Sequence, residues 1–123
     1  MNLLFVADPL EHFKPYKDST FAMMREAAAR GHGLWACEPA QLHWQRGAAV
    51  CAAVRRVVLT GTVDHEWYEA SDAETRALAS FDAVLMRKDP PFDSEYFYAT
   101  HLLQRAEADG ARVFNSPRAL RYM

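Results

Sequence analysis

The 123-residue sequence has few cysteines, no long apolar segment and no basic leader. Its two cysteines, Cys37 and Cys51, form neither a CxxC motif nor a metal-binding spacing, which favours free thiols in a reducing cytoplasm over a disulfide. No apolar run approaches the roughly 20 residues that a membrane-spanning helix needs. The first residues lack the basic segment of a signal peptide. The sequence therefore predicts a cytoplasmic protein that does not associate with membranes.

Charge and glycine patterns also exclude several kinds of partner. The formal net charge of −2 gives no electrostatic basis for nucleic-acid binding. The glycines form neither GxGxxG nor GxxxxGK[ST], the common phosphate-cradling loops. The histidines show no metal-ligand spacing. We therefore expect neither a nucleotide nor a metal ion to be held by this chain.

What the sequence does contain is an alternation of apolar runs and helical patterns within one domain. Cap residues at 18–20 predict a helix start, and Gly31 predicts its end. A second helix is expected from about Ser94 to Ala108, stopped by Gly110. Expected strands lie at residues 3–7, 33–36, 83–86 and 112–114. The pattern predicts an α/β fold: a Rossmann-like, mostly parallel sheet with flanking helices.

The middle of the chain predicts an antiparallel excursion from that sheet. Residues 41–45 and 49–54 flank Gly47, which is typical of a hairpin, and residues 55–60 continue or add a strand. Residues 64–80 are ambiguous. They suggest a short strand near Trp67 and a helical turn, capped by Ser71 or Asp72, that runs through Leu78.

Residues 86–93 (MRKDPPFD) carry the most distinctive local pattern. Charged residues and a rigid Pro-Pro turn follow a buried strand and precede a helix. In open α/β sheets this carboxyl edge of the strands is where ligands bind. The alternative is an ordinary loop with a solvated charge pair.

If the strands at 3–7, 83–87 and 112–114 are parallel neighbours, other polar residues converge on the same edge, together with two helix N-termini. The cations would hold carboxylates of a ligand, and Asp8 or Asp89 would hold its amine. The alternative is that the aspartates cap helices or pair with Arg87 and Lys88. The predicted substrate-binding residues are Lys17, Asp18, Ser19, Arg87, Lys88, Asp89 and Asn115.

Four motifs give the chain a family resemblance. They are DP at 8–9, KDSTFAM at 17–23, MRKDPPFD at 86–93 and NSPRALR at 115–121. With these motifs in this order, the whole chain resembles the N-terminal domain of bacterial glutathione synthetase. Ser116-Pro117 predicts a helix start, and the chain stops at Met123, so we expect residues 1–123 to be one pre-ATP-grasp domain cut from a longer protein.

The resemblance implies an ATP-grasp ligase that joins γ-glutamylcysteine to glycine, with ATP and Mg²⁺ forming an acyl phosphate. In that family the ATP and Mg²⁺ ligands lie in later domains, which are absent here. The chain alone would therefore hold no cofactor and no catalytic residue, and would be inactive. It would contribute to peptide-substrate binding and to contacts in a homo-oligomer. Arg87 would bind a substrate carboxylate or the acyl phosphate, supported by Lys17, Lys88 and Ser19.

Two other interpretations compete with this one. The chain could be a free-standing binding or dimerisation module that uses Trp44, Trp67 and the hairpin. In that case the C-terminal helix should be well packed rather than cut short. A flavodoxin-like nucleotide binder is disfavoured, because the loop after the first strand lacks a Gly/Ser/Thr run for phosphate.

Overall fold

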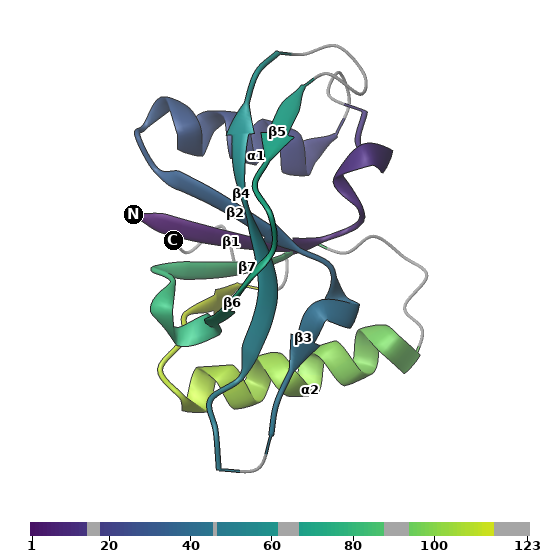
Figure 1. Cartoon of the computed structure of the whole chain (residues 1–123), viewed down its shortest axis with the longest axis vertical. Helices are drawn as coiled ribbons and strands as arrows, with labels where there is room; N and C mark the ends of the chain where they lie inside the picture. Colours follow the sequence, from purple (N-terminus) through teal and green to yellow (C-terminus); the bar gives the residue numbers. More distant parts are fainter. Residues whose placement is uncertain (15–17, 46, 62–66, 88–93, 115–123) are drawn as a thin grey trace.

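The computed structural model describes residues 1–14, 18–45, 47–61, 67–87 and 94–114. Within these residues the strands form one curled, mixed sheet with a helix on each face (Figure 1). In chain order the elements are β1 (Asn2–Ala7), a 3₁₀ helix (Leu10–His12), α1 (Ser19–Ala29), β2 (Gly33–Cys37), a 3₁₀ helix (Pro39–Gln41), β3 (Leu42–His43), β4 (Cys51–Leu59), β5 (Tyr68–Ala70), β6 (Glu74–Ala77), a 3₁₀ helix (Leu78–Ser80), β7 (Ala83–Arg87), α2 (Ser94–Ala108) and β8 (Val113–Phe114).

One half of the sheet is parallel, in the order β2-β1-β7-β8. Its strands are joined by the crossovers β1-α1-β2 and β7-α2-β8, as the sequence predicts. The two crossovers lead away from the centre in opposite directions, so their helices lie on opposite faces (Figure 1). The expected α/β fold class is confirmed, α1 begins where the cap residues place it, and α2 begins at the expected Ser94.

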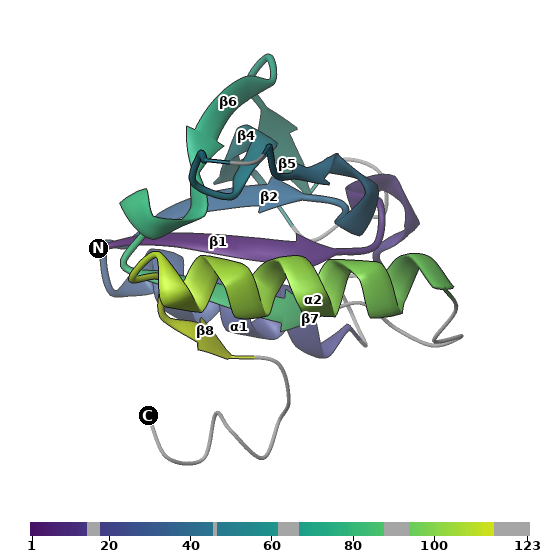
Figure 2. The same cartoon turned by 90° about the horizontal axis from the view of Figure 1, so that it is seen from below.

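The other half of the sheet is antiparallel and is organised by β4. This long strand pairs with β2 near Val57 and with β3 and β6 near Cys51, and the β3–β4 turn contains Gly47 at φ +83°. The predicted hairpin is therefore present. Figure 2 shows β4, β5 and β6 standing together on one side of the molecule, with β8 on the other.

The helical turn expected before Leu78 is wrong, because residues 74–77 form strand β6. The hydroxyl of Ser71, which could have capped a helix, accepts a hydrogen bond from the backbone N–H of Arg56 at 2.8 Å. Pairing with β4 then satisfies the backbone of the next residues, with Arg76 opposite Ala52. A long-range strand ladder has overridden a local capping signal.

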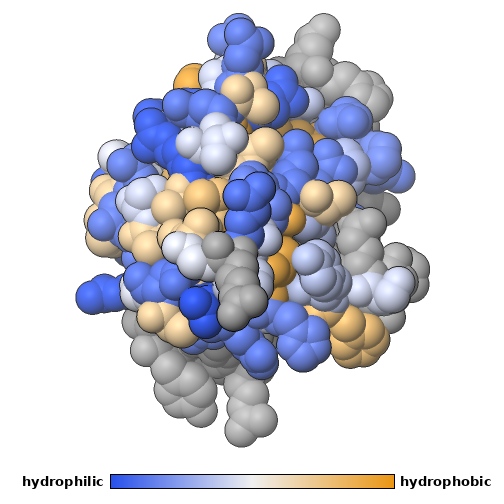
Figure 3. Space-filling model, turned by 60° about the horizontal axis from the view of Figure 1, so that its bottom comes forward, coloured by the Kyte–Doolittle hydropathy of each residue, from blue (hydrophilic) through white to orange (hydrophobic). Residues whose placement is uncertain are grey.

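Side chains alternate along β1 and β7 and so build two separate cores. Leu4 and Val6 belong to the core under α2, with Ala99, Leu103 and Ala106 of the helix. We call this side the α2 face. The outer surface here is mainly hydrophilic, with apolar atoms scattered between (Figure 3).

The opposite core lies under α1, and we call this side the α1 face. Phe5 and Ala7 of β1 pack there against Phe21 and Met24 of the helix. Trp67 completes this core. Its ring stacks on Phe13 with 5.4 Å between centroids, and it is fully buried.

This burial corrects part of the dimerisation hypothesis, because Trp67 cannot touch a partner. Trp44 is 37% exposed, and its indole N–H donates to the Ala48 carbonyl at 2.7 Å. Cys37 and Cys51 are free thiols. Across the described ranges, no helix has the length and apolar composition to cross a membrane. The helix predicted from Ser116 lies outside the described residues.

Candidate functional site

The strand order reverses its direction of growth between β1 and β7. From this central pair α1 and α2 depart to opposite faces, and ligands of open α/β sheets bind at the carboxyl ends of such a pair of strands. Ala7 and Arg87 are register partners at that position. Arg87 therefore stands at the point of the sheet where open α/β folds bind ligands.

The first turn of α1 is fixed by its cap. Asp18 has an extended backbone, and its Oδ1 accepts hydrogen bonds from the backbone N–H groups of Thr20 at 2.8 Å and Phe21 at 3.3 Å. These contacts satisfy two of the N–H groups that a helix leaves unpaired at its start. Asp18 is therefore a helix cap, and its predicted contact with a substrate stays a prediction.

Arg87 extends from the end of β7 to that same first turn. Its Nη2 donates to Ser19 Oγ at 2.9 Å, and its Nε donates to Thr20 Oγ1 at 3.3 Å. Arg87 is half-buried and Thr20 is buried. These two partners are neutral hydroxyls, which orient the guanidinium. The Asp18 carboxylate already occupies N–H groups at this helix start, so an anion bound here would be held by the Arg87 guanidinium.

The structure thus joins three of the predicted site residues, Asp18, Ser19 and Arg87, although Ser19 and Arg87 are 68 residues apart in the chain. Thr20 was missed as part of the site because it reads as one more possible cap. Its position directly after Ser19, on the turn that Arg87 reaches, was the available signal. The remaining predicted residues, Lys17, Lys88, Asp89 and Asn115, lie outside the described residues.

A small cleft of about 70 Å³ lies beside this edge, next to the ends of β1 and β2. Asp8, Glu38 and Arg55 are among its lining residues. Burial, and secondarily the Glu38 carboxylate, raises the pKa of Cys37 to about 12. A thiol with this pKa stays protonated near neutral pH and is a poor nucleophile. In the part of the chain that is described, His, Cys, Asp and Glu side chains form no group of three fit for a metal ion.

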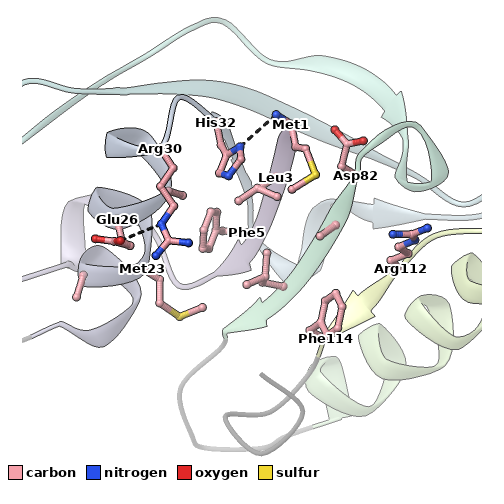
Figure 4. A pocket seen from close by; sticks show the side chains of 14 residues that line it. Met1, Leu3, Phe5, Met23, Glu26, Arg30, His32, Asp82, Arg112 and Phe114 are labelled. Carbon is pink, nitrogen blue, oxygen red and sulfur yellow. Dashed lines mark hydrogen bonds and ion pairs between the residues drawn. The ribbon is translucent and has the colours of Figure 1, made fainter. Parts of the chain in front are cut away.

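A larger hollow, which sequence reasoning did not predict, lies on the α1 face (Figure 4). We call it the α1-side groove. Its volume is about 630 Å³, and it lies between α1 and the strands β7 and β8. Residues that line it include Phe5, Met23, Leu85 and Phe114. At the amino end of the strands, the N-terminal ammonium of Met1 lies 3.2 Å from Nδ1 of His32.

These features define a Rossmann-like α/β domain with an arginine, Arg87, at its carboxyl edge. The model of the family "prokaryotic glutathione synthetase, N-terminal domain" matches residues 1–121, and the chain belongs to that family. The resemblance inferred from the sequence motifs is confirmed.

Glutathione synthetases from several bacteria are close relatives. The chain is 54% identical to that of Ralstonia nicotianae over 121 residues, which are 98% of this chain and 37% of the relative. It is 49% identical to those of Nitrosomonas europaea and Neisseria meningitidis serogroup A, again over 98% of this chain, and covers 38% and 39% of them. The chain therefore spans less than two fifths of the length of these relatives.

Proposed function

We propose that this chain is the substrate-side domain of an ATP-dependent ligase that joins γ-glutamylcysteine to glycine, and that Arg87 binds a carboxylate of the peptide. The observation that carries the proposal is the guanidinium of Arg87, which two hydroxyls of the capped α1 turn hold at the centre of the carboxyl edge. The names of the relatives supply the reaction.

In this proposal the chain binds and orients the peptide rather than moving protons. Arg87 holds the carboxylate, or the phosphate formed on it, and Ser19 donates a hydrogen bond from its hydroxyl. Lys17 and Lys88 add positive charge, Asp89 and Asn115 complete the edge, and Asp18 acts through the α1 turn.

ATP and Mg²⁺ do not fit the described residues, which offer no cluster of metal ligands. The sequence has no phosphate-cradling glycine loop. We therefore place ATP and Mg²⁺ on parts of the enzyme that follow residue 123, and expect the chain alone to catalyse no ligation. The free thiols suit a reducing cytoplasm.

The test is Arg87→Ala in the full-length enzyme. A lost charge-assisted hydrogen bond is worth about 1.5–3 kcal/mol, so we expect KM for γ-glutamylcysteine to rise by roughly tenfold or more while KM for ATP stays within about twofold. Arg25→Ala is the matched control, because Arg25 is an exposed arginine on α1, the helix whose first turn Arg87 contacts. An equal loss for both substrates would mean that Arg87 supports the fold instead.

Calorimetric titration of the 123-residue chain tests which substrates this domain binds by itself. We expect weak binding of γ-glutamylcysteine or none, and no binding of ATP. Measurable ATP binding would contradict the placement of the nucleotide site outside this chain.

We also propose that the chain contributes to contacts in a homo-oligomer through α2. Phe97 and Tyr98 are 59% and 63% exposed on this helix, an unusual pair to leave in water. Sedimentation of the full-length enzyme with Phe97→Ser and Tyr98→Ser should show smaller species. An unchanged mass would rule this surface out.

A further inference from the structure

Trp67 connects the antiparallel half of the sheet to the start of α1. It directly precedes β5, and its backbone is held by the ladder with β4. The Thr60 N–H donates to the Trp67 carbonyl at 2.9 Å, and Tyr68 lies opposite Leu59. The ring itself is fully buried in the α1-face core. A strand that belongs to neither crossover therefore delivers a side chain to the α1 face.

The Trp67 ring contacts two segments that follow each other at the end of β1. Phe13, directly after the first 3₁₀ helix, stacks on it with 5.4 Å between centroids and 12° between planes. Phe21, in the first turn of α1, meets it edge-on, with centroids 5.2 Å apart and 82° between planes. Both arrangements are favourable for aromatic pairs. The indole therefore sets the spacing between the segment after β1 and the start of α1.

These ring contacts, rather than a hydrogen bond, orient the indole. Its N–H is buried and has no acceptor among the described residues, which is unusual in a native core. Such a donor costs stability, and a phenyl ring in the same place would carry none. What Trp67 contributes instead is a rigid surface large enough to touch Phe13 and Phe21 at once.

The turn that Trp67 contacts is the turn that Arg87 reaches. The backbone N–H of Phe21 donates to Asp18 Oδ1 at 3.3 Å. The two residues before Phe21, Ser19 and Thr20, accept the hydrogen bonds of the Arg87 guanidinium at 2.9 and 3.3 Å. A displacement of this turn by about 1 Å would carry the longer contact beyond hydrogen-bonding distance. The geometry of Arg87 thus depends on where the Phe21 ring is held.

We propose that Trp67 is a positioning residue for the peptide-binding site. It holds the α1 turn at the place where its hydroxyls orient Arg87, without contacting the substrate itself. This inference rests on the proposed role of Arg87 in binding a carboxylate of the peptide. It adds that affinity for the peptide depends on a residue from the antiparallel half of the sheet.

Steady-state kinetics of the full-length enzyme test this role. Trp67→Leu removes the flat ring, so KM for γ-glutamylcysteine should rise roughly fivefold or more, while KM for ATP stays within about twofold. Trp67→Phe keeps a ring and should recover most of the loss. Trp35→Leu is the matched control, because Trp35 is also buried but belongs to the α2-face core. It should lower Tm without raising KM. Equal rises in KM for Trp35→Leu and Trp67→Leu, or no rise for Trp67→Leu, would overturn the proposal.

A double variant distinguishes failure of this inference from failure of the proposed function. If Trp67 acts through Arg87, Trp67→Leu should change KM for γ-glutamylcysteine by less than about twofold once Arg87→Ala is present. A full fivefold rise in that background would contradict the positioning role while leaving the role of Arg87 intact. An unchanged KM for Arg87→Ala alone would refute the proposed function, and the link between Trp67 and peptide binding with it.

Hydrogen–deuterium exchange of the full-length enzyme gives a readout that needs no substrate. Amides of residues 18–24 should exchange several-fold faster in Trp67→Leu than in the parent, and at nearly the parent rate in Trp35→Leu. Unchanged exchange there in Trp67→Leu would show that the turn does not depend on the indole, and would overturn the proposal. If Trp67→Leu fails to fold, Phe13→Leu loosens the same ring contacts more mildly and should shift KM and exchange in the same directions.

Discussion

The two faces of the sheet are built by the same kind of crossover but are closed to different degrees. On the α2 face, Leu102 and Leu103 of the 15-residue helix are 6% and 3% exposed. On the α1 face, the 11-residue helix buries Met24 completely but leaves Met23 half-exposed beside the groove. The Arg87 side chain lies on the α1 face, where it contacts Ser19 and Thr20. The difference shows that one face is closed by its helix, whereas the other has an apolar groove beside its helix.

The largest effect expected from this difference is in thiol reactivity. Cys37 belongs to the α2-face core, and burial with the Glu38 carboxylate raises its pKa from 9.0 to about 12. Because only the thiolate reacts, the rate of alkylation by iodoacetamide at pH 8 should be roughly a thousandfold lower in the native chain than in urea. Mass spectrometry of the Cys37 peptide measures this, and Cys51, which is half-buried, provides the internal comparison.

The same shift has a consequence for stability. The folded-state pKa of Cys37 is raised, so its contribution to stability is complete below about pH 9 and is lost as pH rises towards 12. Native alkylation of Cys37 as fast as in urea would show that the α2 face opens readily.

Truncation of one apolar side chain on each face gives the next largest effect. Leu103→Ala should lower the free energy of unfolding by about 2–5 kcal/mol, because the cavity forms in a closed core. Met23→Ala should cost about 1 kcal/mol or less, because this side chain beside the open groove is already partly in water. Urea denaturation measures both values. Equal costs would mean that the two faces are equally closed in solution.

The smallest effect concerns the cap that organises the α1 turn. Asp18→Ala should lower the free energy of unfolding by about 1 kcal/mol, because two backbone N–H groups lose their acceptor. Asp18→Asn keeps an acceptor oxygen and should lower the free energy of unfolding by only a few tenths of a kcal/mol. Urea denaturation of both variants measures the two values. A large loss for Asp18→Asn would show that the charge, rather than the cap geometry, holds this turn.

Local patterns predicted much of this fold. The helix expected from about Ser94 to Ala108 has those bounds, because Gly110 ends it and its apolar residues recur at helical spacing. The helical turn predicted over 74–77 was wrong, because the pairing of this segment with β4 depends on residues 20 to 26 positions earlier. No local pattern carries that information.

The candidate site was also predicted only in part from local patterns. The charged strand end and the helix start near Ser19 follow from the sequence, and so does their place at the carboxyl edge. The contact between Arg87 and the buried hydroxyl of Thr20 does not, since many neighbouring polar residues could have faced that strand end.

By itself, the sequence determined most of the elements, the family and the place of Arg87 at the carboxyl edge. Caps, alternation and short motifs depend on residues a few positions apart, so they can be read along the chain. Only the tertiary structure decided that Arg87 meets the hydroxyls of Ser19 and Thr20, and that an apolar groove lies between α1 and β8. These features depend on how helices of fixed length pack across a twisted sheet. That packing brings together residues almost 70 positions apart.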